Sequence, residues 1–512
     1  MLFIMSLYHV MKVRLMSIKK NIPVPFQKMT AVFVLAIMMM QYCCSAFAET
    51  ITTRTEPTCT EAGQILTEDT ETHVVKAETI PALGHSFGEW EKIPNSNYEE
   101  RICTVCGYTE RQLSESKEER AAARLELTGD MLGINKKNRV TLHAAFTGEG
   151  ESFSCYAIMT LQGHSTLGLD KPNYTVRFYD DAEGKVKHKL QFMDWQKEHK
   201  YILKADYYDV TQCRNLAGAR LWREVTATRE NLNPRIASLP TLGAVDGFPV
   251  SVWLNGEFLG LYTLCLHKDD DLFAMEEGEQ AAILICNAHT EDEAEFRAPA
   301  ELDEDGIHDW EIEFCGTGEW VWAKDSFNDF ISFVMHSSDE EFKAKLPAYL
   351  DVDAAIDYLI FIYTLGLRNS GVKDLVLVTF GDGWIPSAYD MDEAFGLMPK
   401  GEGSYAPDDF LPDCVNGVWT SGTDSLLWDR LLQNYEDEIR ERYLELRKGP
   451  LSEQSILSVT DSLSKSIPQS LYLRDAERYP GRPTADEMME QIHRYLNERL
   501  PALDSVLGGE SK

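Results

Sequence analysis

The chain has 512 residues, 44% of them hydrophobic and 10% aromatic, which is enough for one large core and a smaller module. Its formal net charge of −34 repels the phosphate backbone of nucleic acids, so nucleic-acid binding is not expected. Binding of a nucleotide remains compatible with this charge, because bound Mg²⁺ can offset negative charge locally.

The N-terminal segment, residues 1–48, predicts a signal peptide and therefore a secreted or cell-surface protein. It carries five Lys or Arg residues and no Asp or Glu, and residues 31–40 are all apolar. Ten apolar residues are too few to span a bilayer comfortably, but they suit a signal-peptide core. Ala46 and Ala48 then fit the small-x-small cleavage rule. The alternative is an N-terminal membrane anchor; after cleavage, no membrane attachment is expected.

Residues 49–115 predict a small β-rich module with a possible zinc site. The segment is rich in Thr and Glu, and it resembles small Cys-containing repeats of exported proteins. Two cysteines separated by two residues in a hairpin-like run are typical of a zinc-knuckle turn. The candidate ligands of a structural Zn²⁺ are Cys59, His85, Cys103 and Cys106. The alternative is a Cys103–Cys106 disulfide or free thiols.

After a charged, helix-prone linker at 116–124, the sequence predicts an α+β domain over 125–508. Strand-like runs occupy its first half, at 156–163, 174–181, 199–206, 248–266 and 281–286. Helix-like spacing follows at 325–347, 352–366, 424–447, 453–465 and 484–507, interrupted by strand-like runs at 374–380 and 383–392. A strand-rich first lobe and a helix-rich second lobe are therefore expected.

Two blocks in the first half carry candidate nucleotide-binding residues. A Gly/Ser/Thr turn that includes Gln162 and Ser165 lies between two strands, and Lys171 begins the second strand. Backbone N–H groups of such a turn can cradle phosphate, and a lysine can pair with it. The alternative is an ordinary loop with a solvated lysine. Farther on, Asp209 precedes an apolar-periodic run and suits helix capping, whereas Arg214 is a candidate to bind substrate or to pack.

Two blocks in the second half carry candidate metal ligands. Asp390 and Asp392 follow an apolar strand and precede a Gly turn, so their carboxylates suit Mg²⁺ coordination. Asn369 and Asp374 lie in a loop between a helix and a strand, with oxygen atoms able to bind metal or orient a hydroxyl. Turn formation alone is the alternative for that loop. The acidic run 269–271 is expected to be solvated surface.

Taken together and in this order, the blocks resemble the CotH kinase-like family over about residues 125–505. The matching segments are 162–178, 204–215, 250–264, 368–380 and 389–397, followed by a helical tail at 425–447. The resemblance implies an atypical protein-kinase-like fold that binds ATP and Mg²⁺. It also implies transfer of phosphate to Ser or Thr of coat or secreted proteins.

Residue by residue, the resemblance puts Asp392 at the family's metal-binding aspartate, with Asp390 beside it, and Lys171 in its basic strand. Asn369 stands where the family has its catalytic aspartate, and Asp374 where it has an asparagine. An amide cannot accept the proton of a substrate hydroxyl. The chain is therefore interpreted as a degenerate kinase that binds nucleotide or as an enzyme with a relocated carboxylate. The competing hypothesis is a non-catalytic adhesion or structural protein of the cell surface or matrix.

Overall fold

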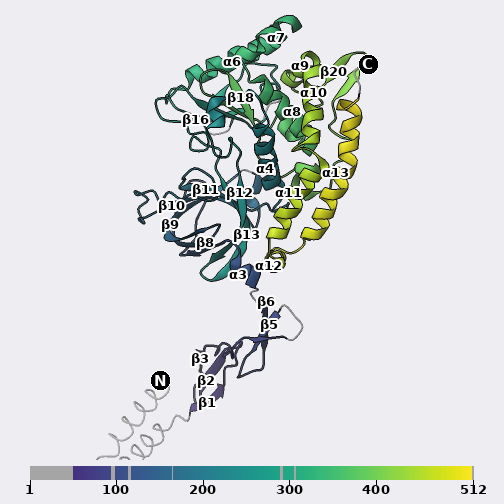
Figure 1. Cartoon of the computed structure of the whole chain (residues 1–512). Coiled ribbons are helices and arrows are strands. Elements are labelled where there is room, and N and C mark those ends of the chain that lie inside the picture. The colour runs from purple at the N-terminus through teal and green to yellow at the C-terminus, as the bar shows by residue number, and fades with distance from the viewer. Residues whose placement is uncertain are drawn as a thin grey trace, which may run out of the picture. The chain divides into compact units, whose positions relative to one another are not determined.

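The computed structural model describes residues 50–93, 98–113, 117–163, 165–288, 292–304 and 307–509 (Figure 1). The predicted signal peptide lies outside the described residues. The chain divides into two compact units, Met1–Ser114 and Glu115–Lys512. Within the part of the chain that is described, no helix combines the length and the apolar character that a bilayer span requires.

The N-terminal unit consists of two small antiparallel sheets. The first sheet is formed by β1 (Thr50–Thr55), β2 (Gly63–Asp69) and β3 (Val75–Ile80), and the second by β4 (Glu91–Lys92), β5 (Tyr98–Ile102) and β6 (Thr109–Leu113). Among the described residues of this unit, Cys59 and Cys103 are the buried hydrophobic residues. A module of this size without an apolar core needs a metal or a covalent link for stability.

The larger unit begins with a closed seven-stranded barrel. Its strands follow the order β10-β11-β13-β12-β7-β8-β9, with antiparallel pairs except for the parallel pair β12–β7. The strands are β7 (Arg124–Thr128), β8 (Val140–Gly148), β9 (Glu151–Gln162), β10 (Asn173–Tyr179), β11 (Lys200–Lys204), β12 (Gly247–Leu254) and β13 (Glu257–Leu266). Asn255 and Gly256, both at positive φ, form the tight turn between β12 and β13.

Residues 116–124, predicted as a linker, lie in this larger unit. They contain the short helix α3 (Lys117–Ala121), and Arg124 already starts the first barrel strand. The Glu119 carboxylate is buried and accepts a hydrogen bond from Arg474 of α12. A charged, helix-prone sequence therefore packs against a helix more than 300 residues later in the chain.

A five-stranded sheet, in the order β15-β16-β14-β17-β18, follows the barrel. Its strands are β14 (Ala282–Cys286), β15 (Leu302–Asp303), β16 (Trp310–Cys315), β17 (Val376–Thr379) and β18 (Trp384–Ser387). The central strand β14 is buried along its whole length. Cys286 on β14 and Cys265 on β13 are buried free thiols.

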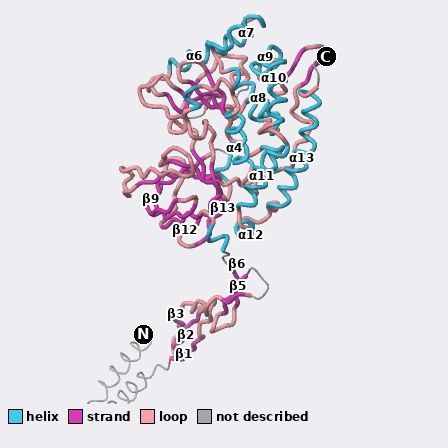
Figure 2. Tube along the Cα trace, in the orientation of Figure 1, coloured by secondary structure: helices cyan, strands magenta, loops and turns pink. Residues whose placement is uncertain are grey.

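Helices complete the larger unit, which confirms the mixed α+β class; the detailed likeness of its two parts to kinase lobes stays a prediction. Figure 2 shows the helices in cyan beside the magenta barrel strands. The helices are α4 (Arg214–Ala227), α5 (Pro234–Ala237), α6 (Val321–His336), α7 (Asp339–Lys345), α8 (Val352–Leu365), α9 (Leu426–Asn434), α10 (Glu436–Lys448), α11 (Glu453–Ser466), α12 (Gln469–Arg478) and α13 (Ala485–Leu507). Nearly every side chain of α8 is buried, so this helix is the centre of the helical core.

Two helices predicted as continuous are each divided in the structure. The helix expected at 325–347 ends at His336, and a new one starts after Ser338. Ser338 and Glu341 form a capping box, which stabilises a helix start at that point. The helix expected at 424–447 divides at Tyr435 into α9 and α10.

Candidate functional site

A cleft of about 650 Å³ lies between the barrel and the five-stranded sheet. Barrel strands β9, β10 and β11 line one side, and β14, β16 and the loops beside β17 and β18 line the other. The charged residues that line it are Lys136, Lys204, Asp206, His267, Lys268, Glu311, Glu313, Lys373, Asp374, Asp390 and Asp392. The cleft thus gathers lysines and carboxylates from distant parts of the chain.

Lys204, the last residue of β11, pairs with Asp390 just after β18. Its Nζ donates to Asp390 Oδ1 at 2.5 Å and to Asn215 Oδ1 at 3.3 Å. Asn215, on the first turn of α4, also donates to Asp206 Oδ1 at 2.7 Å. The Asp390 side chain remains 39% exposed, whereas the Lys204 side chain is only 9% exposed. One asparagine therefore holds the lysine and a second carboxylate in place while Asp390 still faces the cleft.

The carboxylates of the cleft repel one another, and their pKa values show it. Burial, with the neighbouring charge of Asp390, raises the pKa of Asp374 to about 7. Burial and Asp390 likewise raise the pKa of Asp392 well above its usual value. Burial acts in the same direction on Asp390, but the Lys204 ammonium outweighs it and lowers the Asp390 pKa. A crowded set of hard oxygen ligands of this kind is relieved by a divalent cation.

Three carboxylate residues that line the cleft adopt a backbone conformation that non-glycine residues rarely use. The φ angles are 42° at Asp206, 65° at Asp374 and 51° at Asp390. Positive φ in residues other than glycine carries strain and concentrates at functional sites. The local backbone is thus fixed in a conformation that turns these side chains toward one cleft.

Asn369, which the resemblance puts at the catalytic position, contacts a different carboxylate. Its Nδ2 donates to Glu393 Oε2 at 2.8 Å. Asn369 begins the short 3₁₀ turn η3 (Asn369–Gly371), five residues before Asp374. Burial raises the pKa of Glu393 to about 7. A carboxyl group with a pKa near neutrality therefore lies directly beside the amide that replaces the expected aspartate.

The turn before β10 lies at the cleft, although the lysine of that block does not. Gln162 and Thr166 line the cleft, and Ser165 begins the 3₁₀ turn η1 (Ser165–Gly168). Asn173 joins this turn to the end of β11, since its side chain donates to the Thr166 hydroxyl and accepts from the Ala205 N–H. The turn and Lys204 are thereby held together.

Lys171 and Arg214 lie outside the cleft lining. The Lys171 side chain is completely buried, and its Nζ lies 3.1 Å from the Asp475 carboxylate on α12. Arg214 is also buried and donates to Asp209, to the Ala394 carbonyl and to Gln491. Asp374 and Asp392 therefore line one cleft, and Lys204 is among the lysines that line it with them, whereas Lys171 is not.

Sequence reasoning missed Lys204 and Asp206, which line the cleft with other charged residues, and Glu393, which contacts Asn369. Lys204 and Asp206 stand at the end of an apolar strand, the same pattern that singled out Asp390 and Asp392. Asp209, predicted as a helix cap, does accept hydrogen bonds from the backbone N–H groups of Cys213 and Arg214 at the start of α4. Its position, five residues before the first residue of α4, differs from that of an ordinary N-cap.

The four predicted zinc ligands of the N-terminal unit form a cluster. One ligand atom from each of Cys59, His85, Cys103 and Cys106 lies within 4.8 Å of the others. Cys106 Sγ is 3.3 Å from His85 Nδ1, and no disulfide joins the described cysteines. Burial acts against ionisation of Cys103, but N–H donors from Cys106 and Val105 lower the pKa of its thiol to about 5. Thiolate and imidazole ligands in this arrangement fit tetrahedral Zn²⁺.

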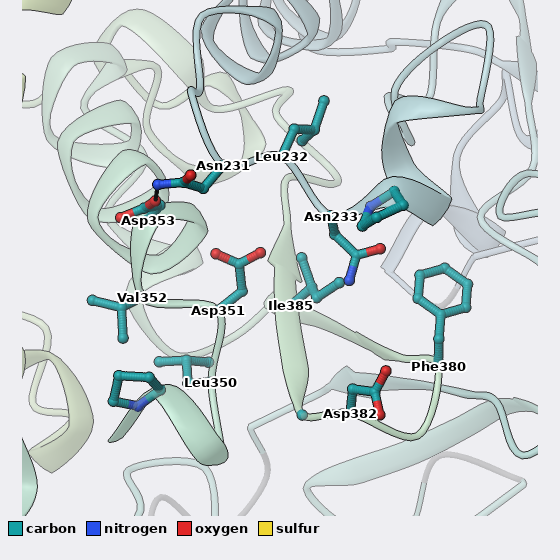
Figure 3. A pocket seen from close by; sticks show the side chains of 13 residues that line it. Asn231, Leu232, Asn233, Leu350, Asp351, Val352, Asp353, Phe380, Asp382 and Ile385 are labelled. Carbon is teal, nitrogen blue, oxygen red and sulfur yellow. Dashed lines mark hydrogen bonds between the residues drawn. The ribbon is translucent and has the colours of Figure 1, made fainter. Parts of the chain in front are cut away.

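A second cavity of about 490 Å³ opens near the start of α8 (Figure 3). Asp351, Asp353 and Asp382 are its carboxylate residues. Asp351 caps α8 by accepting from the Ala354 N–H, and Asp353 accepts from the Asn231 side chain at 3.5 Å. Two of its three carboxylates thus serve the local structure.

The comparisons with known proteins bear on the larger unit. A family model described as CotH kinase protein matches residues 159–503, which include every charged cleft residue named above except Lys136. No curated protein matches the chain.

Proposed function

Because the chain belongs to the CotH kinase protein family, we propose that its cleft binds ATP with Mg²⁺ and that the protein phosphorylates Ser or Thr hydroxyls of exported proteins. The convergence of Lys204, Asp374, Asp390 and Asp392 in one cleft carries the proposal. Phosphoryl transfer requires positioning, neutralisation of phosphate charge and an acid–base residue near the acceptor. Each requirement has a candidate group here.

Asp374 and Asp392 are the residues that fit Mg²⁺. Both are half-buried carboxylates with raised pKa values, so a cation that keeps them ionised is bound favourably. When bound, Mg²⁺ supplies charge neutralisation for the phosphates. Lys204 supplies a fixed positive charge at the same place, and Asp390 orients it through their ion pair. Gln162 and the adjoining turn offer polar groups from the opposite wall.

Glu393 is proposed as the relocated general base. In the reaction, the acceptor oxygen bonds to the γ-phosphorus, the bond to the β-phosphate oxygen breaks, and the hydroxyl proton moves to the Glu393 carboxylate. A base with a pKa near 7 is well matched to this task at neutral pH. Asn369 cannot accept the proton, but its hydrogen bond fixes the orientation of Glu393.

The test uses the whole chain with labelled ATP, Mg²⁺ or Mn²⁺ and a Ser-rich acceptor protein. Labelling is expected in the wild type and in Asp382→Ala, a carboxylate of the second cavity, and is expected to be lost in Asp392→Ala. Equal labelling of all three would show that the cleft does not hold the active site. The absence of both labelling and ATP-dependent thermal stabilisation would exclude every nucleotide role.

A second candidate function, a non-catalytic adhesion or structural role at the cell surface, is favoured by Asn369 at the catalytic position. In that case the protein is expected to bind a surface polymer equally with and without ATP.

Both proposals include secretion through the N-terminal segment. The N-terminal sequence of protein recovered outside the cells tests it. Retention of residues 1–48 on that protein would contradict the signal peptide.

Within the N-terminal unit, we propose a structural Zn²⁺ held by the cluster of Cys59, His85, Cys103 and Cys106. The observation in its favour is that the unit buries two cysteines and no other described hydrophobic side chain. Zinc retained by the whole chain should fall by one ion in Cys103→Ser. An unchanged zinc content would rule out this site.

A further inference from the structure

A second group of metal-binding side chains occurs on the barrel, away from the carboxylates of the nucleotide cleft. One ligand atom each from Glu198, His199 and Asp271 lies within 4.8 Å of the other two. Glu198 and His199 precede β11, and Asp271 follows β13. The run 269–271 was predicted to be solvated surface, but this is wrong at Asp269, which is 6% exposed and pairs with Lys200 and His267.

Two of the three side chains in this group are almost fully buried and have polar atoms without partners. Glu198 is 4% exposed and His199 is 6% exposed. Glu198 Oε2 and His199 Nδ1 are buried and have no hydrogen-bond partner. Leaving a buried carboxylate oxygen and a ring nitrogen unpaired destabilises the folded state. A bound ion or water is one way in which such groups are satisfied.

The backbone around these side chains is fixed, as a metal site requires. Glu198 exchanges two backbone hydrogen bonds with Leu190, at 2.7 and 2.8 Å. The His199 carbonyl accepts from the Phe178 N–H of β10 at 2.8 Å, and the Asp271 carbonyl accepts from the Gln196 side chain at 3.2 Å. The ligand atoms therefore converge without any rearrangement of the main chain.

We infer that Glu198, His199 and Asp271 bind a divalent cation of the zinc class. Two carboxylates and one imidazole are ligands that Zn²⁺ accepts, whereas Mg²⁺ and Ca²⁺ favour oxygen ligands alone. Three protein ligands leave one position of a tetrahedral site for water. The bound cation balances the two carboxylate charges and satisfies atoms that otherwise lack partners.

The cation has a structural consequence for the nucleotide cleft. Asp271 belongs to the segment that follows β13, and His267 and Lys268 at the beginning of that segment line the cleft. A cation at Glu198 ties this segment to the residues just before β11, and β11 ends at Lys204. The site therefore stiffens one wall of the cleft, although its existence does not depend on nucleotide binding.

The direct test measures zinc retained per chain after the whole protein is loaded with Zn²⁺ in excess Mg²⁺ and desalted. Glu198→Gln and Asp271→Asn are each expected to retain one zinc fewer than the wild type. Asp270→Asn, which removes a neighbouring carboxylate outside the group, is expected to retain the wild-type content. Equal zinc in all four proteins would overturn the inference. The cysteine cluster does not affect the result, because it is intact in each protein.

A second measurement covers the case in which a substitution disturbs folding. The Cys103→Ser chain keeps Glu198, His199 and Asp271 but lacks the complete cysteine cluster. In excess Mg²⁺ it is expected to bind one Zn²⁺ and to unfold at a higher temperature when zinc is present. If it binds no zinc and its melting temperature does not change, the barrel site does not exist.

Discussion

Two buried lysines of the larger unit, Lys171 and Lys204, each form an ion pair with an aspartate, yet their surroundings differ. The partner of Lys171, Asp475, has a side chain that is 7% exposed, and it also accepts from Arg482 and from the Leu261 N–H. The partner of Lys204, Asp390, has a side chain that is 39% exposed and faces a cleft. The first pair joins α12 to the barrel, whereas the second leaves carboxylate oxygens available to a ligand.

The difference shows that burial of a lysine does not by itself identify a nucleotide site. What distinguishes Lys204 is that other carboxylates, with strained backbones and raised pKa values, share its cleft. Around Lys171, by contrast, burial lowers the lysine pKa, and aromatic rings of Tyr262 and Tyr479 cover its ammonium. These surroundings are typical of a structural ion pair.

The largest effect is expected on the cleft side, at Glu393. Glu393→Gln should lower the rate of phosphoryl transfer by about 10²–10⁴-fold, because it removes the proposed base, while ATP binding stays unchanged. Steady-state transfer assays and ATP titrations measure the two quantities. Adding Asn369→Asp to this variant should recover part of the rate. If Glu393→Gln transferred phosphate at the wild-type rate, another residue would have to be the base.

Substitution of the two lysines should separate binding from stability. Lys204→Met is expected to weaken ATP binding by roughly 10- to 150-fold, because it removes one charged hydrogen-bond donor. Lys171→Met is expected to leave the ATP affinity within about twofold of the wild type and to lower the free energy of unfolding by about 3 kcal/mol. Calorimetric titration and urea unfolding measure these effects. If Lys171→Met weakened ATP binding and Lys204→Met did not, the nucleotide would bind at Lys171 instead.

A smaller effect should appear in the pH dependence. Asp374 and Glu393 have pKa values raised to about 7, so transfer activity should increase as the pH rises through 7. Because both pKa values lie above those of an unfolded chain, the two carboxyls make the fold less stable as the pH rises from about 4 to 7. Melting temperatures with and without Mg²⁺ measure this trend, and Mg²⁺ is expected to weaken it.

The ion pair of Lys171 and Asp475 should show a different pH dependence of stability. Burial opposes ionisation of Asp475, but Lys171 and Arg482 outweigh it and lower the pKa of that carboxyl. A lowered pKa contributes stability that is present above the unfolded value and is lost only as the pH falls through the folded value. Between pH 5 and 8, ionised Asp475 therefore contributes a constant stability. In Lys171→Met, the loss of stability should be the same at both ends of that range.

The sequence predicted the elements that carry strong local signals. The apolar runs at 199–206 and 248–266 became β11 and the hairpin β12–β13, and the spacing at 352–366 became α8. Asp374 and Asp392 could be paired because Asp374 precedes one clear strand and Asp392 follows the next, and both lie in recognisable family segments. The described cysteine cluster could also be predicted, since its ligand types and the resemblance to small Cys-containing repeats pointed to the same four residues.

The rest depended on contacts between distant residues. Lys171 and Asp475 are 304 positions apart, and nothing near Lys171 indicates which partner buries it. The role of Glu393 depends on a side-chain contact with Asn369 that no periodicity encodes. The charged run 269–271 was predicted to be exposed because acidic residues usually are, but Lys200 and His267 compensate the burial of Asp269.

The central claim, that the cleft around Lys204 is a nucleotide site, is tested most directly by calorimetric titration of the whole chain with Mg·ATP. The wild type and Lys171→Met should bind one nucleotide with similar affinity, and Lys204→Met should bind it at least tenfold more weakly. Binding by the wild type that is unaffected in Lys204→Met, or no binding by the wild type at all, would contradict the account.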